Sequence, residues 1–391
     1  MLASLAACGG YDGASDGGSP ITDAPGLGAC ELAATASYPS GPWPRGVVVA
    51  DLNADAHLDL VIPSEDDLMR VMYGTSSGAF IEGYVMAGAR PIAIAVGDFT
   101  EDGRVDIAVS GSPTMMSPAV SILEGHPDGT FTRLPQSLPI AASHLVAADF
   151  DHDGHLDVVA SSSSGIRVFP GSGTGTFTTS VPELMLGQTP TFEVADVDGD
   201  GLLDLIAVSS FKLVVRRSGP GTTIMYDTGG VYPRDLAIGD LDADTDLDLV
   251  VVNGDDDTVR LFFNSGGSFE TQSDLPTDIP PGSDGAGTGS GSNVGSWLPR
   301  NAAIGDFTAD GVNDVMVLIE PYLPTTDESK MLVLERSANM SFSQHPCSMA
   351  IRPVGVVAGN FVGDARTDAI IVAAPYNASS GGAVMIVQQA P

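Results

Sequence analysis

The sequence predicts an all-β protein: a seven-bladed β-propeller with four antiparallel strands in each blade. A nine-residue Asp-rich motif occurs seven times, with first positions at residues 51, 98, 149, 196, 240, 306 and 360. Every copy lies between two short apolar segments, as a turn joining two strands would. Strand-like units that repeat about every 40–50 residues are typical of propellers. Seven copies therefore indicate seven blades.

The first two strands of each blade are expected on either side of the motif. The second is a continuous apolar run, such as residues 249–252, which indicates burial on both faces of the sheet. The first ends in a small residue, as expected where chains crowd near the central axis. These small residues are Ala50, Gly97, Ala148, Ala195, Gly239, Gly305 and Gly359.

The two outer strands follow in order. A third apolar segment, such as residues 120–123, leads through a Gly-rich turn to a fourth strand. Fourth strands are expected to begin near Phe80, Phe131, Phe177, Phe269 and Phe342. The last repeat stops after its third strand, at residues 383–387, and residues 30–38 can supply the missing one. This pairing would close the ring and leave no unpaired sheet edge.

The motif is predicted to bind Ca2+, most clearly in the third copy. Its carboxylates fall at positions 1, 3, 5 and 9 with Gly at position 6, and position 7 adds a backbone carbonyl. Oxygen ligands at this density favour calcium over zinc or copper, which prefer His or Cys, and over the more strongly hydrated magnesium. The alternative is a set of solvated turns, which Asp and Gly favour for backbone reasons.

The repetition of one spacing favours metal sites over turns. The predicted ligand positions are Asp51, Asn53, Asp55, His57 and Asp59; Asp98, Thr100, Asp102, Arg104 and Asp106; Asp149, Asp151, Asp153, His155 and Asp157; Asp196, Asp198, Asp200, Leu202 and Asp204; Asp240, Asp242, Asp244, Asp246 and Asp248; and Asp306, Thr308, Asp310, Val312 and Asp314. The seventh copy, Asn360, Val362, Asp364 and Asp368, has an apolar side chain at position 3 and is expected to bind weakly or not at all.

The composition limits the choice of partner and compartment. The formal net charge is -34, with 50 acidic and 16 basic residues, which argues against nucleic acid and against anionic membrane surfaces. Loops of this kind usually fill at the millimolar calcium found outside cells. We therefore expect an extracellular or cell-surface protein.

The N-terminal segments are predicted to precede the folded domain. Residues 1–8 resemble the end of a bacterial lipoprotein signal in which Cys8 would be lipidated. The charged start and full apolar segment of such a signal are missing, so a misassigned or trimmed start is the alternative. Residues 9–29 read as a flexible tether, residues 30–391 as the propeller and residues 271–297 as a flexible insertion. Cys30 and Cys347 could form a disulfide in an oxidising compartment, or stay as unpaired thiols.

The Asp-rich units and their Gly-x-Phe turns, such as Gly129-Thr-Phe131, resemble the FG-GAP/VCBS repeat family. This family forms the propeller of integrin α chains and of many bacterial surface proteins. The resemblance covers residues 30–391 and implies that the aspartates between strands 1 and 2 hold Ca2+. Thr100, Thr308 and Val362 depart from the family pattern at position 3, which puts full coordination there in question.

The face opposite the calcium loops is the predicted partner surface. The connections between strands 2 and 3, and between successive blades, share this face and carry the long insertions, where binding residues are usually found. Its arginines could bind a carboxylate or an acidic sugar, and its aromatic residues could stack on sugar rings; charge balance and packing are the alternatives. The candidate residues are Trp43, Arg45, Arg90, Tyr232, Arg234, Trp297, Arg300, Tyr322, Arg352 and Tyr376.

We predict a monomeric protein- or glycan-binding adhesion module with structural calcium and no enzymatic activity. The six histidines show no zinc spacing, and neither a nucleophile elbow nor a nucleotide-binding motif is present. One alternative is a lectin, or a polysaccharide lyase or hydrolase, on the same scaffold. The other is a purely architectural module of a surface complex, because propellers host many unrelated functions.

Overall fold

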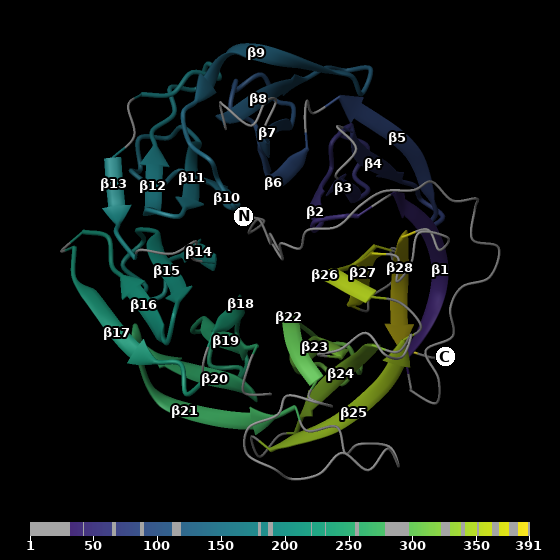
Figure 1. The fold of residues 1–391 in the computed structure, drawn as a ribbon, viewed down its shortest axis with the longest axis vertical. Helices are drawn as coiled ribbons and strands as arrows, with labels where there is room; N and C mark the ends of the chain where they lie inside the picture. Colours follow the sequence, from purple (N-terminus) through teal and green to yellow (C-terminus); the bar gives the residue numbers. More distant parts are fainter. Residues whose placement is uncertain are drawn as a thin grey trace.

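The computed structural model describes residues 32–389 except 42, 65–67, 87–89, 112–118, 179–180, 187–190, 220, 231, 255–257, 278–296, 322–328, 338–340, 350–351, 362–366 and 375–381. These residues form seven four-stranded antiparallel sheets arranged as blades around a central axis (Figure 1). The predicted seven-bladed propeller is confirmed. Among the described residues, no helical segment has the length and apolar character needed to cross a bilayer.

Each blade is numbered by the order of its inner strand in the chain. Blade 1 contains β2 (Val48–Ala50), β3 (Asp59–Pro63), β4 (Leu68–Gly74) and β5 (Phe80–Met86); blade 2 contains β6 (Pro91–Gly97), β7 (Asp106–Gly111), β8 (Ala119–Gly125) and β9 (Phe131–Leu138); blade 3 contains β10 (His144–Ala148), β11 (Asp157–Ser162), β12 (Gly165–Phe169) and β13 (Val181–Leu184); blade 4 contains β14 (Thr191–Ala195), β15 (Asp204–Ser209), β16 (Lys212–Arg216) and β17 (Thr223–Asp227). Blade 5 contains β18 (Pro233–Gly239), β19 (Asp248–Asn253), β20 (Thr258–Ser265) and β21 (Ser268–Pro276); blade 6 contains β22 (Trp297–Gly305), β23 (Asp314–Pro321), β24 (Ser329–Arg336) and β25 (Phe342–Met349); blade 7 contains β26 (Arg352–Gly359), β27 (Asp368–Ala374), β28 (Gly382–Gln389) and β1 (Leu32–Gly41).

Blade 7 combines the two ends of the chain, as predicted. β1 pairs with β28 in antiparallel register from Leu32 opposite Gln389 to Gly41 opposite Gly382. β1 thereby becomes the outer strand of a blade whose other three strands come from the C-terminal end (Figure 1). This pairing covers the edge that β28 would otherwise expose.

The Asp-rich motif marks the ends of the strands. All seven inner strands end at the predicted small residue, and all seven second strands begin at the position-9 aspartate. Two boundaries differ from prediction. The outer strand of blade 3 begins at Val181 rather than near Phe177, because Phe177 instead forms an isolated bridge with Gly171. The predicted insertion at residues 271–297 starts inside a regular strand, since β21 continues to Pro276.

The core consists of seven apolar clusters, one between each pair of neighbouring blades. All six residues of β19 are buried, which explains the continuous apolar pattern of second strands. The small residues that end the inner strands face the next blade. A Cβ on Gly97 would lie 2.6 Å from Leu156 Cδ1. The crowding at this position therefore comes from the side chains of the neighbouring blade.

Candidate metal centres and partner face

The six loops that carry most of the predicted metal ligands share one backbone conformation. Positions 4 and 6 have positive φ in every loop, for example 60° at His152 and 94° at Gly154 in the third. The position-6 N–H donates to the position-1 carboxylate in all six, as from Gly154 to Asp149 Oδ2 at 3.1 Å. The position-7 N–H likewise donates to the position-5 carboxylate in all six. These bonds fold the loop into a compact turn.

The position-9 aspartate connects this turn to the rest of its blade. Asp157 Oδ2 accepts the N–H of Phe150 at 2.9 Å, and its Oδ1 accepts the N–H of Gly171, beyond the third strand, at 2.8 Å. The same pair of backbone bonds recurs in blades 1 to 6. All seven position-9 aspartates are fully buried. Sequence reasoning treated position 9 as a metal ligand only and missed this structural role.

Position 2 of each loop anchors the turn in the core. Its side chain packs into the apolar cluster shared with the following blade, as Val197 does between blades 4 and 5. The residues at this position are Leu52, Phe99, Phe150, Val197, Leu241, Phe307 and Phe361. The signal was available in the sequence, since position 2 is apolar in every copy. Each loop therefore connects its own blade to the next one.

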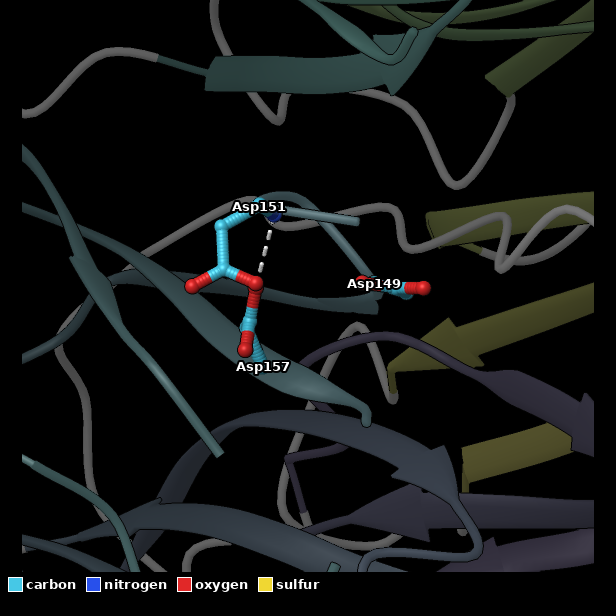
Figure 2. A group of neighbouring side chains, drawn as sticks. All are labelled: Asp149, Asp151 and Asp157. Carbon is cyan, nitrogen blue, oxygen red and sulfur yellow. Dashed lines mark hydrogen bonds between the residues drawn. The ribbon is translucent and has the colours of Figure 1, made fainter. Parts of the chain in front are cut away.

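Three loops bring carboxylates together in groups that could hold a metal ion. In each group the ligand oxygens of positions 1, 3 and 9 lie within 4.8 Å of one another. The groups are Asp149, Asp151 and Asp157; Asp196, Asp198 and Asp204; and Asp240, Asp242 and Asp248. Figure 2 shows the first group, in which the Asp151 N–H donates to Asp157 Oδ2 at 3.3 Å.

The third loop also contains an unsatisfied oxygen. Asp149 Oδ1 is buried and has no hydrogen-bond partner. A buried, unpartnered carboxylate oxygen is costly unless a cation or a donor satisfies it. The donor set of this loop, carboxylate oxygens only, therefore fits a hard cation such as Ca2+.

The other two acidic groups differ from the third loop in their neighbours. Burial, followed by the charge of Asp244, raises the pKa of Asp242 in the fifth loop, as expected for crowded carboxylates. In the fourth loop Arg217 Nε lies 3.4 Å from Asp198 Oδ2. That guanidinium already neutralises part of the charge that a metal would neutralise.

In two loops, the position-3 residue donates hydrogen bonds to the position-9 carboxylate, which is thereby satisfied without a cation. In the second, Thr100 donates both its N–H and its Oγ1–H to Asp106 Oδ2, each at 3.1 Å. In the sixth, Thr308 makes the same two bonds to Asp314, each at 3.1 Å. Arg104 also pairs with the Asp102 carboxylate inside the second loop. The sequence expectation of weaker coordination at position-3 threonines thus has a physical reason.

The first and seventh loops form no group of three metal-ligating side chains among the residues that the structure describes. In the first, Asn53 Oδ1 accepts the Asp55 N–H at 3.1 Å, and Asn53 Nδ2 donates to Asp55 Oδ2 at 3.1 Å. In the seventh, Val362 and Asp364 lie outside the described residues. Asp368 Oδ1 there accepts from Gln388 Nε2 at 2.6 Å.

Burial raises the pKa of the position-9 carboxylates in the first six loops. Desolvation raises the pKa of Asp59, Asp157 and Asp248 to about 6, against the opposing effect of their backbone hydrogen bonds. A carboxyl with this pKa titrates close to neutral pH. Protons and a metal ion would therefore compete for the same oxygens.

On the opposite face, the start of several inner strands is reshaped by β-bulges. The pairing shifts by one residue just after a proline, between Pro233 and Asp235 and between Pro299 and Asn301, which places Arg234 and Arg300 on the bulges. A bulge bends the strand and redirects the side chain that it carries. Comparable shifts occur in blades 2 and 7.

Three of the five predicted arginines come together here. The Arg300 and Arg352 Nε atoms lie 3.1 and 3.0 Å from the two oxygens of Glu320. Arg234 and Arg352 are close enough that their charges, after desolvation, help to lower the pKa of Arg300. Glu320 was not predicted as a site residue.

The other predicted partner residues are distributed around the same face. Trp43 and Arg45 flank the Pro44 bridge of blade 1, and Arg90 directly precedes the inner strand of blade 2. Tyr232 is exposed and lies beside Phe211, which sequence reasoning missed, with ring centroids 6.1 Å apart. The Trp297 side chain, Tyr322 and Tyr376 lie outside the described residues.

Cys347 is buried in β25 and takes part in a disulfide. Its partner is outside the described residues, as are Cys8 and Cys30, so the Cys30–Cys347 bond and lipidation of Cys8 stay predictions.

A family model described as FG-GAP-like repeat matches residues 98–160 and 149–207. These residues include the second, third and fourth Asp-rich loops, and the other blades repeat the same loop and strand pattern. No curated protein matches the sequence of this chain.

Several solved structures are similar to this chain in fold. The structure of BBS1N in complex with ARL6DN has a TM-score of 0.59 at 13% identity and aligns over 92% of this chain and 97% of that one. An Agrocybe aegerita lectin, described as recognising non-reducing terminal N-acetylglucosamine, has a TM-score of 0.50 at 16% identity, covering 88% and 89%. A Lactobacillus plantarum protein has a TM-score of 0.51 at 13% identity, covering 78% and 84%. Identities this low show the fold alone.

Proposed function

We propose that this propeller of FG-GAP-like repeats is an extracellular binding module that calcium stabilises, with its partner on the face opposite the metal loops. The observation that carries the calcium assignment is the buried and unpartnered Asp149 Oδ1 within a group of three carboxylates. We assign calcium to the third and fifth loops first, and to the fourth loop in competition with Arg217.

Electrostatics favours a divalent cation in these loops. Two carboxylates 4.8 Å apart repel by about 0.9 kcal/mol even in a dielectric like that of water, and by more when partly buried. Calcium accepts six to eight oxygen ligands in flexible geometry, which suits carboxylates and carbonyls on one turn. The proposed role of the metal is structural, because the loop joins two blades through positions 2 and 9.

An extracellular location agrees with two features. Calcium sites of this type fill at the millimolar concentrations found outside cells. The disulfide at Cys347 also favours an oxidising compartment. Anchoring to a membrane through Cys8 would be compatible with this location and needs its own test by mass spectrometry.

A binding role rather than catalysis is proposed from the character of the opposite face. The enzyme alternative requires paired carboxylates that a substrate can reach away from the metal loops. Glu193 and Asp235 interact electrostatically between blades 4 and 5, but both are buried, and Asp235 accepts the N–H of Ala302 at 2.9 Å. Solved structures of similar fold include a lectin and a protein complex, so a glycan or a protein partner is compatible with the scaffold.

Calcium binding to the chelator-treated full chain, measured by isothermal titration calorimetry, tests the proposal. We expect two to three equivalents, and Asp149→Asn should remove one of them. Thr100→Ala, in a loop that satisfies itself, is the control and should leave the stoichiometry unchanged. Absence of binding at millimolar calcium, or equal binding by the Asp149→Asn variant, would overturn the calcium assignment.

A further inference from the structure

A hydrogen bond between neighbouring blades joins the third and fourth metal loops. The Leu203 N–H, at position 8 of the fourth loop, donates to His152 Nε2, at position 4 of the third loop, at 3.2 Å. The side chains of Phe150, at position 2 of the third loop, and Leu203 also pack against the same apolar cluster between blades 3 and 4. The fourth loop is therefore attached to the third both in the core and at its polar surface.

The N–H that His152 accepts belongs to the peptide group of a predicted metal ligand. Position 7 of each loop is expected to offer its backbone carbonyl to the cation, and in the fourth loop this is the carbonyl of Leu202. The Leu202 carbonyl and the Leu203 N–H are parts of one planar peptide group, in which they point in opposite directions. The bond to His152 therefore fixes the direction of the carbonyl and increases the negative partial charge on its oxygen.

The fourth loop depends more than the others on an aligned carbonyl. Its three clustered carboxylates are those of Asp196, Asp198 and Asp204, but Arg217 Nε lies 3.4 Å from Asp198 Oδ2. Because the guanidinium neutralises part of the charge that attracts a cation, uncharged oxygen ligands supply a larger share of the coordination.

The side chain at position 4 decides whether a loop reaches the next one. The position-4 residues of the six loops are Ala54, Glu101, His152, Gly199, Ala243 and Ala309. Alanine and glycine are too short, whereas Glu101 pairs with the His155 side chain of the third loop and His152 bonds to the fourth. Among the position-4 residues of these described loops, His152 is the one that bonds to the main chain of the next loop. Its φ of 60° is close to the 58° of Ala54, so the backbone conformation does not require histidine.

We propose that His152 is a positioning residue for calcium in the fourth loop and couples that site to the one in the third loop. The inference rests on the proposed calcium binding and adds the order in which two sites fill. Calcium in the third loop would hold Asp151 and Asp153, the residues on either side of His152. An ordered His152 in turn holds the Leu202 carbonyl. Filling the third loop should thus raise the calcium affinity of the fourth, and the reverse effect should have the same factor.

Calcium titrations of the chelator-treated full chain by isothermal titration calorimetry measure this coupling. Asp242→Asn removes the fifth-loop site in every protein compared, and Asp149→Asn or Asp198→Asn then identifies the third or the fourth loop. His152→Ala should weaken calcium binding to the fourth loop about 3- to 10-fold, as expected for one neutral hydrogen bond, and leave the third loop unchanged. His152→Gln, which keeps an acceptor at similar reach, should restore most of the affinity.

A double-mutant cycle separates the coupling from a general loss of structure. Asp149→Asn should weaken calcium binding to the fourth loop when His152 is present and have no further effect in the His152→Ala background. Since alanine occupies position 4 of three other loops with similar φ, the His152→Ala chain should stay folded in chelator. His126→Ala changes a histidine in the turn after β8, outside the metal loops, and should leave both affinities unchanged.

The outcomes distinguish this inference from the proposed function. Equal fourth-loop affinity in the parent and in His152→Ala would overturn the inference, as would a parent fourth loop that binds no calcium. An effect of Asp149→Asn on the fourth loop that persists in full without His152 would also overturn it, because the coupling would then run through Phe150 and the apolar interface. In these cases calcium binding to the third and fifth loops still supports the metal assignment. Absence of calcium binding to every loop would instead overturn the proposed function itself.

Discussion

Replacing Asp151 and Asp242 by threonine should change stability in opposite directions with and without calcium. Both residues occupy position 3 of acidic groups whose ligand oxygens lie within 4.8 Å. Threonine at the same position in the second and sixth loops instead donates two hydrogen bonds to the position-9 carboxylate. The double variant therefore converts two proposed metal loops into loops of the self-satisfied kind.

The magnitudes follow from the geometry. Without metal, each substitution removes two of the three carboxylate repulsions in its group, about 2 kcal/mol at a dielectric like that of water. Each substitution also removes one hydrogen-bond acceptor; in the third loop this is the Asp151 carboxylate, which accepts the Asp153 N–H at 3.2 Å. After this loss, the free energy of unfolding without metal should rise by about 1 kcal/mol per loop. With calcium at tenfold excess over Kd, each lost site lowers the free energy of unfolding by about 1.4 kcal/mol.

Thermal unfolding of the full chain in chelator and in calcium measures both effects. We expect the variant to melt a few degrees above the parent in chelator and to show a smaller calcium-induced rise in Tm, at about 2 °C per kcal/mol. Glu270→Thr, on the exposed outer strand β21, removes charge outside the loops and should leave the calcium-induced rise unchanged. A variant that melts lower than the parent in chelator, or that keeps the parent's full calcium response, would refute the reasoning.

Three further predictions concern the loops and the ring. Thr245→Gly should raise the free energy of unfolding by about 0.5–1 kcal/mol, because Thr245 has φ of 78° at a position where four other loops have Gly. The reverse change in the third loop, Gly154→Thr, should lower the Tm. Burial raises the folded-state pKa of Asp157 and Asp248 to about 6, above the unfolded value of 3.8, so without metal these carboxyls reduce stability as pH rises from about 4 to 6. Calcium should remove this cost, so its stabilising effect should be larger at pH 7 than at pH 5; an equal Tm shift at both would contradict the assignment. Deleting residues 1–41 removes β1 and exposes the edge of β28, which should produce aggregates or dimers in size-exclusion chromatography, and a soluble monomer would argue against closure by β1.

The starts of the second strands could be predicted because the position-9 aspartate is both the last residue of the loop and the first residue of the strand. The position-9 aspartate is a sequence landmark, and its burial at the head of β3, β11 or β19 explains why the spacing located these strands correctly. Its bond to the turn after the third strand could not be predicted. Asp157 and Gly171 are 14 residues apart, and only the pairing of β11 with β12 brings them together.

The partner face was predictable in part. The arginines and Tyr232 stand next to prolines at the start of inner strands, which gave a local signal. Phe211 and Glu320 have no such local signal, because the role of each depends on contact with a residue 20 or more positions away. Phe211 lies beside Tyr232, and Glu320 pairs with Arg300 and Arg352. Long-range contacts of this kind depend on the order of the blades around the ring.

The apolar interfaces between neighbouring blades connect the metal-loop face of the propeller to the partner face. Phe150, Val197 and Leu241 follow the first ligands of the three acidic loops and pack between blades 3 and 4, 4 and 5, and 5 and 6. On the partner face, Phe211 belongs to blade 4, Tyr232 to blade 5 and Arg300 to blade 6, so these residues are supported by the same interfaces. A metal that orders these loops would stabilise the partner face without touching the partner. Calcium removal should then weaken partner binding through looser blade contacts, and by linkage the partner should tighten calcium binding by the same factor.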